Sequence, residues 1–194
     1  MIRQILTKLS GGDEDAQIVS SVLNGNKGLY RVLVQKHQRH VYGMGLSFFH
    51  NPDDAAEFTQ DVFLQSYRKL EQFEGKARFS TWLYRIAWRT AVNRKGRMKE
   101  YQSLAGDETE TDAPRGAYDT PEEAYVKEAA RAAVREAVKE LPEKYRVCID
   151  LYFFFGQSYQ EIELITGFPV NTIKSHVFRA KKILKEKLQD FIER

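Results

Sequence analysis

The sequence predicts an all-α protein of two small helical domains joined by a flexible acidic linker. Apolar residues recur at helical spacing along most of the 194 residues, and no strong strand-pairing signal occurs. The net charge is only +3, but its distribution is uneven: residues 68–99 hold ten Lys or Arg against two acids, and residues 100–128 hold nine acids against two basic residues. Low apolar content and like charge then predict a tether over residues 106–120.

These changes in composition divide the chain into segments. We expect an N-terminal arm with a first helix, a first domain, a flexible acidic linker and a second domain, over residues 1–23, 24–98, 99–120 and 121–194. The basic middle and the basic end of the chain point to a polyanionic partner at two separate places. No signal peptide is evident, and no run approaches the roughly 18 apolar residues of a membrane span, which predicts a cytoplasmic protein without membrane insertion. Cys148, in an apolar run, is expected to be a buried residue in a reducing compartment.

The first domain is expected to contain helices separated by turn signals, over residues 18–23, 28–49, 55–70 and 82 to about 95. Asn51 or Asp53 can cap the third of these beside Pro52, because a side-chain oxygen there accepts from free backbone N–H groups. Ser80 or Thr81 is predicted to cap the fourth in the same way. His37 and His40 have no carboxylate or cysteine at metal-ligand spacing, so neither a metal site nor a cofactor is expected.

Helix 55–70 has two predicted faces. Ala55, Phe58 and Val62, with Tyr67 or Phe63, can turn towards a core. The other side is mixed in character, with an acid–amide–leucine patch of Glu57, Gln60, Asp61 and Leu64. Such a patch is either plain solvent surface or a docking face for a basic or helical partner. The spacing alone leaves both interpretations open.

The loop 73–79 and the helix after it combine small, basic and aromatic residues. Aromatic side chains on this helix alternate with arginines, as in Trp82, Arg85 and Arg89. Single-stranded nucleic acid needs this combination, because bases stack on aromatic rings and cations bind the backbone. The alternative is a well-packed helix with core tryptophans and solvated arginines, and on this segment alone that alternative is slightly favoured.

The second domain is expected to contain helices over residues 122–141 and 143–155, followed by a helix-turn-helix. Gly167 ends the first helix of that motif, Pro169 follows it, and Asn171 or Thr172 is predicted to cap the second. One side of the second helix is apolar, and the other carries a concentration of positive charge. Phosphates attract that charge, and the first turns of such a helix can present side chains to base edges. An αα-hairpin with a solvated lysine face is the alternative.

Several stretches, in this order, resemble the extracytoplasmic-function sigma factors, a family of two-domain bacterial transcription initiation factors. The resemblance covers residues 24 to 188. Its most specific string is Phe-Ser-Thr-Trp-Leu-Tyr-Arg-Ile-Ala at 79–87, and the others are the opening helix 25–42, Asp-Ala-Ala-Glu-Phe-Thr-Gln-Asp-Val-Phe at 54–63, Phe-Glu-Gly at 73–75, Leu-Pro-Glu-Lys-Tyr-Arg at 141–146 and the helix-turn-helix. The resemblance implies binding to core RNA polymerase, promoter selection and DNA melting. It also implies an anti-sigma factor as a partner, no cofactor and no enzymatic activity.

Residue by residue, the resemblance implies three contact sets. The set for the clamp helices of the polymerase beta-prime subunit is Asp54, Glu57, Gln60, Asp61 and Leu64. The set that melts and reads the minus-ten element is Lys76, Arg78, Phe79, Ser80, Trp82, Tyr84, Arg85, Trp88 and Arg89. The set that reads the minus-thirty-five element is Asn171, Thr172, Lys174, Ser175, Phe178, Arg179 and Lys182.

Some positions depart from the family pattern. Ala56 replaces an acid, Arg89 an Asn, Glu163 a small residue at the helix–helix crossing, Asn171 a Gly, and His176 an Arg. The string 172–177 also resembles the reading helix of LuxR-type regulators, which makes such a regulator the alternative function. That class needs a βαβα receiver domain, and residues 1–120 show no alternating strands. A nucleic-acid enzyme would need clustered carboxylates or a phosphate-binding glycine loop, and a pure protein adaptor would not need two basic segments.

Overall fold

The computed structural model describes residues 14–102, 133–134 and 136–192, and its chain divides into two compact units. Both units are helical, and the described residues contain no strand, so the all-α prediction is confirmed. The predicted tether over residues 106–120 and most of the predicted helix 122–141 lie outside the described residues. The predicted domain boundaries therefore stay predictions.

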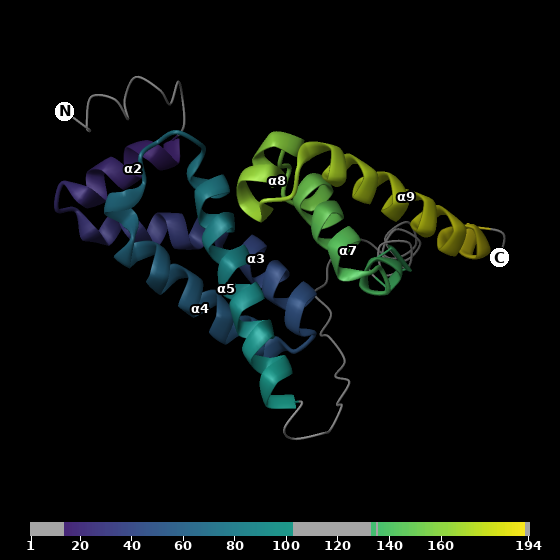
Figure 1. Cartoon of the computed structure of the whole chain (residues 1–194). Coiled ribbons are helices and arrows are strands. Elements are labelled where there is room, and N and C mark those ends of the chain that lie inside the picture. The colour runs from purple at the N-terminus through teal and green to yellow at the C-terminus, as the bar shows by residue number, and fades with distance from the viewer. Residues whose placement is uncertain (1–13, 103–132, 135, 193–194) are drawn as a thin grey trace, which may run out of the picture. The chain divides into compact units, whose positions relative to one another are not determined.

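The N-terminal unit is a bundle of α2 (Glu14–Leu23), α3 (Tyr30–Phe49), α4 (Pro52–Arg68) and α5 (Phe79–Gln102), with short 3-10 turns η1 (Lys27–Leu29) and η2 (Leu70–Gln72) (Figure 1). Its core contains the fully buried side chains of Leu33, Phe58, Phe79 and Leu83, one or more from each long helix. Burying side chains of this size stabilises a fold by about 1.5–3 kcal/mol each. The core therefore fixes α3, α4 and α5 relative to one another.

Helices α3 and α4 approach each other closely at a glycine. A Cβ atom on Gly45 would lie 2.8 Å from Cδ1 of Phe58 and 3.0 Å from Cα of Ala55, so only glycine fits here without a shift. Between the two helices, His50 adopts a left-handed backbone with φ 55°, and its N–H donates to the Leu46 carbonyl at 3.0 Å. Asn51 then caps α4, as predicted, because its side chain accepts from the N–H groups of Asp53 and Asp54.

Two predicted helix starts in this unit are wrong. Helix α2 begins at Glu14, four residues before the predicted Ile18, because Asp15 and Ala16 are buried against the bundle. Helix α5 begins at Phe79, and the Trp82 N–H donates to the Arg78 carbonyl at 3.1 Å. Ser80 and Thr81 therefore lie inside the first turn and do not cap it. The buried Phe79 side chain belongs to this first turn, and α5 also continues to Gln102, past the predicted end of the helix at about residue 95.

The C-terminal unit contains α7 (Glu143–Ile149), a π-helical turn η3 (Asp150–Phe154), α8 (Tyr159–Thr166) and α9 (Val170–Ile192), with helical residues 133–134 and 136–139 before them. Leu151, Ile162, Ile165 and Ile173 form its fully buried centre. The predicted continuous helix 143–155 is thus an α-helix followed by a π-turn. The turn leaves Phe153 and Phe154 each 52% exposed.

The helix-turn-helix is present and Gly167 ends its first helix, both as predicted, but the second helix begins earlier than predicted. Ser158 and Glu161 form a capping box at the start of α8, and Gly167 ends that helix in the left-handed conformation with φ 78°. Helix α9 begins at Val170, and the Ile173 N–H donates to the Pro169 carbonyl at 3.0 Å. Asn171 and Thr172 are therefore first-turn residues, and the prediction that one of them caps α9 is wrong.

Candidate nucleic-acid interfaces

The exposed side of α9 is the clearest candidate surface in the C-terminal unit. Ile173, Val177 and Ala180 are buried on one side of the helix, so its opposite side turns outwards. Those exposed residues are Asn171, Lys174, Ser175, Phe178, Arg179 and Lys182, while Thr172 is half-buried. Phe178 is 71% exposed, which is unusual for a large apolar side chain. The structure thus places the predicted minus-thirty-five set on one face of one helix.

Arg179 and His176 both contact α7. Arg179 Nη1 lies 3.4 Å from the Tyr145 hydroxyl, and this hydrogen bond, with the charge of Lys144, holds the pKa of Tyr145 below its usual value. The His176 ring lies 5.2 Å from that of Tyr145, and its Nδ1 is 3.7 Å from Cys148 Sγ. Burial, followed by the charges of Lys144 and Arg179, lowers the pKa of His176. His176 is therefore a neutral packing residue at pH 7 and adds no positive charge to the exposed face.

Cys148 of α7 is fully buried, as predicted, and lies against His176 of α9. Burial raises the pKa of its thiol to about 12, so the nucleophilic thiolate is scarce at neutral pH.

Among the described residues, no group of three or more His, Cys, Asp or Glu side chains is arranged to hold a metal ion. No described helix is long and apolar enough to cross a membrane.

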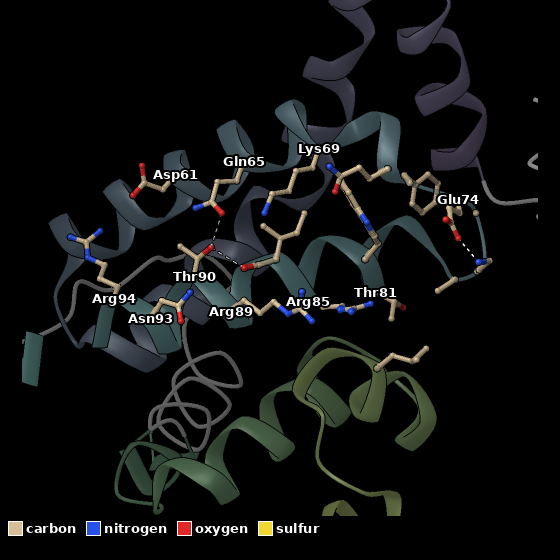
Figure 2. Close-up of a pocket in the computed structure, with 18 of the residues that line it drawn as sticks. Asp61, Gln65, Lys69, Glu74, Thr81, Arg85, Arg89, Thr90, Asn93 and Arg94 are labelled. Carbon is tan, nitrogen blue, oxygen red and sulfur yellow. Dashed lines mark hydrogen bonds and ion pairs between the residues drawn. The ribbon is translucent and has the colours of Figure 1, made fainter. Parts of the chain in front are cut away.

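A second candidate surface lies between α4 and α5 in the N-terminal unit. Figure 2 shows Arg85, Arg89 and Asn93 along α5, facing Asp61 and Gln65 of α4 and Lys69, which directly follows α4. Arg85, Arg89 and Asn93 are exposed and follow one another at intervals of four residues, which places them on one side of the helix. The Thr90 hydroxyl connects the two helices at 3.4 Å from Gln65 Oε1. Asn93, Gln65 and Lys69 were not among the predicted site residues, because each is an ordinary solvent residue until the helices pair.

The loop before α5 adds small and basic residues to this surface. Lys76 and Arg78 are exposed, Ser80 is half-buried, and Lys76 forms an ion pair with Glu74. Gly75 has a left-handed backbone with φ 69°, which lets the loop turn sharply beside the surface. Trp82 is half-buried and packs against Phe73 in an edge arrangement with ring centres 5.6 Å apart, so the protein holds its ring on one side and leaves part of it accessible.

Two predicted minus-ten residues belong to the core. Phe79 is fully buried, and Tyr84 is 2% exposed, so neither can stack on a base in this conformation. Phe79 packs against His37 and Phe73, and Tyr84 lies against His37 and His40 of α3. Trp88 is half-buried and contacts Phe48, at 5.5 Å between ring centres. Of the aromatic side chains in the predicted minus-ten set, only Trp82 and, in part, Trp88 remain accessible for stacking on a base.

The mixed patch on α4 is present, and Arg94 modifies it. Ala55, Phe58, Val62 and Phe63 are buried, whereas Glu57, Gln60 and Leu64 are exposed and Asp61 is half-buried. The core position left open between Phe63 and Tyr67 goes to Phe63, because Tyr67 is 39% exposed. Arg94 Nη2 on α5 lies 3.0 Å from Asp54 Oδ1 and 2.7 Å from Glu57 Oε2. Two of the predicted polymerase-contacting carboxylates therefore have a partner within the unit.

Comparison with known proteins identifies the family. A model of sigma-70 region 2 matches residues 33–99, and a model of sigma-70 region 4 matches residues 131–184. The RNA polymerase sigma-H factor of Pseudomonas aeruginosa is 32% identical over 93% of this chain and 96% of its own length. The extracytoplasmic-function sigma-E factor of Escherichia coli is 33% identical over 93% of this chain and 97% of its own length. The chain belongs to the extracytoplasmic-function sigma factors. The family binds core RNA polymerase and promoter DNA, and the LuxR-type alternative is not supported.

Other relatives agree with this assignment. The sigma-E factor of Haemophilus influenzae, of the same extracytoplasmic-function class, is 32% identical over 90% of this chain and 95% of its own length. The fold is that of a sigma factor from Bartonella quintana solved with the anti-sigma factor NepR, with a TM-score of 0.68 and 24% identity over 82% of this chain and 96% of that one. The first-domain match places α3 to α5 in region 2, and the second-domain match places α7 to the middle of α9 in region 4. As a sigma factor, the chain is a transcription initiation factor.

Proposed function

We propose that the three exposed surfaces divide the work of this sigma factor between them. The α4 patch contacts the beta-prime clamp helices of core polymerase, the loop 73–79 and α5 open and read the minus-ten element, and α9 reads the minus-thirty-five element. One observation carries the proposal: Ile173, Val177 and Ala180 are buried on one side of α9, and the exposed side of the same helix is basic. A helix that only packed would not need five cations, Lys174, Arg179, Lys181, Lys182 and Lys185, on its exposed side.

On α9, the two ends of the exposed face have different roles. Lys174, Ser175, Phe178 and Arg179 lie in the first half of the helix, which enters the major groove, where each base pair has a distinct pattern of donors and acceptors. Asn171 and Thr172 belong to the first turn, next to the backbone of the DNA. Lys182 and Lys185 lie further along, where the helix leaves the groove, and contact phosphates. Arg179 already carries its guanidinium at the surface, held by Tyr145.

On the N-terminal unit, Arg85 and Arg89 supply positive charge to the opened strand, and Trp82 supplies a ring on which a base stacks. Lys76, Arg78 and Ser80 surround the point where a base leaves the duplex. Extruding a base costs a few kcal/mol, and stacking on an aromatic ring returns about 1–3 kcal/mol. Phe79 and Tyr84 act indirectly, because their burial fixes the start of α5 beneath this loop.

On α4, the exposed leucine at the centre of an acid–amide patch suits a helical partner with basic residues around an apolar contact. Gln60, Asp61 and Leu64 provide the direct contacts. Asp54 and Glu57 contribute through the Arg94 ion pairs, which hold their carboxylates at one edge of the patch. Ala56 is exposed and contributes no charge there.

A regulator and a location follow from the family. The chain is proposed to be held inactive by an anti-sigma factor, as its structural relative from Bartonella quintana was solved with one. It acts in the cytoplasm, where polymerase and promoter DNA are found, and it catalyses no reaction by itself.

Run-off transcription with purified core polymerase on a promoter library tests the proposal. We expect the full chain to direct initiation at promoters that share one minus-thirty-five and one minus-ten element. The double variant Arg85→Ala, Arg89→Ala should lose open complexes, whereas Gln38→Ala, an exposed change on α3, should not. Initiation that shows no dependence on promoter sequence would contradict the proposal.

A further inference from the structure

The turn between α8 and α9 is held at both ends by one residue, Glu163. The Gly167 N–H donates to the Glu163 main-chain carbonyl at 2.8 Å, which ends α8. The Val170 N–H donates to the Glu163 side-chain Oε1 at 3.1 Å, at the start of α9. Main chain and side chain of the same residue therefore fix the exit from one helix and the entry to the next.

The N-terminus of α9 has a specific need for that side chain. Pro169 precedes the helix and has no N–H, so Val170 provides the first N–H group of the helix end. The first turn of α9 contains no acidic residue, and the partial positive charge of a helix N-terminus attracts anions. Glu163 meets this need from the neighbouring helix.

The position of this carboxylate matters for DNA binding. A helix N-terminus with free N–H groups binds phosphate of any sequence, because backbone groups carry no base information. The exposed residues proposed to read bases, Lys174, Ser175 and Phe178, begin one turn after Val170. A carboxylate on the Val170 N–H occupies the place where such a phosphate would bind and repels phosphates nearby.

We propose that Glu163 is a positioning and specificity-determining residue for the minus-thirty-five element. Its hydrogen bond to Val170 fixes how α9 leaves the turn, which sets the register of the reading residues. Its charge keeps phosphate away from the helix end, which weakens binding to DNA of the wrong sequence. This inference rests on the proposed function, in which α9 reads promoter DNA.

The test uses the polymerase holoenzyme with the full chain and two promoters that differ only in an intact or a scrambled minus-thirty-five element. The measured quantity is the ratio of the two dissociation constants, for wild type, Glu163→Gln and Glu163→Ala. Glutamine keeps an acceptor for the Val170 N–H and loses the charge, so we expect about 2- to 5-fold tighter binding to the scrambled promoter, with little change on the intact one. Alanine loses both, so binding to the intact promoter should also weaken, by about 3- to 10-fold.

The control variant is Glu186→Gln, which removes the charge of an exposed carboxylate on α9, about four helical turns after Val170. We expect it to leave the ratio at the wild-type value, because Glu186 is far from the helix N-terminus. A wild-type ratio in both Glu163 variants, or the same change in Glu186→Gln as in Glu163→Gln, would overturn the proposal. Should Glu163→Ala fail to fold, as judged by its circular dichroism, the glutamine variant decides alone. A wild-type holoenzyme that does not distinguish the two promoters would refute the proposed function itself.

Discussion

The Arg94 guanidinium on α5 lies 3.0 Å from the Asp54 carboxylate in the first turn of α4, and its carbon lies 5.2 Å from the centre of the Phe49 ring. One side chain of α5 thereby connects three helices, because Phe49 is the last residue of α3 and Asp54 lies in the first turn of α4. The Arg94 side chain is 22% exposed and that of Asp54 is 32% exposed, so solvent screens this pair only in part. The contact holds the edge of the α4 patch in place.

We predict that Arg94→Ala lowers the free energy of unfolding of the N-terminal unit by about 1–2 kcal/mol, through the lost ion pairs and the lost cation–π contact. Urea unfolding followed by tryptophan fluorescence measures this, since both tryptophans, Trp82 and Trp88, lie in that unit. A double-mutant cycle with Asp54→Asn should give a larger coupling energy than one with Glu57→Gln, because the Glu57 side chain is 65% exposed. Equal coupling to both carboxylates would contradict the geometry.

The α4 patch should lose its affinity for core polymerase when its charge is reversed. We predict that the double variant Gln60→Ala, Asp61→Lys binds core at least about tenfold more weakly, mainly through a slower association, since charges at an interface rim act on the encounter. The unfolding free energy should stay within about 0.5 kcal/mol of wild type, because neither side chain belongs to the core. A titration of labelled core polymerase measures the affinity. Gln38→Ala on α3 is the matched surface control, and unchanged core affinity in the double variant would refute the docking assignment.

The loop before α5 should be needed for DNA melting and dispensable for folding. We predict that the double variant Lys76→Ala, Arg78→Ala forms closed complexes but gives weak permanganate reactivity of thymines in the minus-ten region, because it loses the cations beside the extruded base. The single variant Trp82→Ala should also reduce melting, because it removes the ring on which a base stacks. Loss of this stacking costs about 1–3 kcal/mol per base. Glu71→Gln, an exposed change in η2, is the control. Wild-type reactivity in the double variant would exclude this loop from the melting step.

A buried acid connects α2 to the bundle and should make stability depend on pH. Asp15 is 5% exposed, and its carboxylate contacts His37 Nε2 and Lys36 Nζ, each at 2.7 Å. Burial by itself would raise the pKa of Asp15, but the hydrogen bonds and charges of His37 and Lys36 outweigh it, so the pKa lies below its ordinary value. A carboxyl group with a lowered folded-state pKa contributes stability above its unfolded pKa of about 4, and this contribution is lost as the pH falls through the folded pKa.

We therefore predict that Asp15→Asn costs about 1–3 kcal/mol at pH 7, and that its difference from wild type shrinks below about pH 4. Urea unfolding with tryptophan fluorescence at several pH values measures both quantities. Glu14→Gln, at the exposed neighbouring acid that also contacts Lys36, should cost much less. A difference that stays constant down to pH 3 would show that Asp15 acts without its charge.

Much of the fold was predictable because local signals agreed with burial. The Asn51–Pro52 start of α4, the Gly167 end of α8 and the helical period of Ile173, Val177 and Ala180 all correspond to what the structure shows. The start of α5 was not predictable in this way. Ser80 and Thr81 are good caps by residue type, but Phe79 is drawn into the core by partners that lie far away in sequence, including His37.

The candidate site was predictable to the level of helix faces, and less so for single side chains. Tyr84 and the exposed Arg85 are adjacent in sequence, yet Tyr84 is buried because α3 presents His37 and His40 to it. No property of the α5 sequence contains that information. The Glu163 side chain was expected only as a departure from a small residue at a helix crossing, and its bond to Val170 depends on the turn geometry.

Base reading and phosphate binding on α9 are expected to depend on different side chains. Arg179 lies in the half of the helix proposed to enter the major groove, and Lys182 lies further along. A bidentate contact between arginine and guanine contributes roughly 1–3 kcal/mol of discrimination at one base pair. We therefore expect Arg179→Ala to relax preference at a single position of the minus-thirty-five element. Lys182→Ala should weaken binding to all sequences alike and lower the salt dependence by about one unit of slope.

Binding of both variants, as holoenzyme, to a set of promoters with single-base changes in the minus-thirty-five element measures these effects. Arg179 also contacts Tyr145, so Tyr145→Phe serves as the matched control for loss of that hydrogen bond. We expect Tyr145→Phe to keep the wild-type order of preference, because the guanidinium remains at the surface. If Arg179→Ala instead weakens every promoter by the same factor, Arg179 is a phosphate-binding cation like Lys182, and base reading falls to Lys174, Ser175 and Phe178.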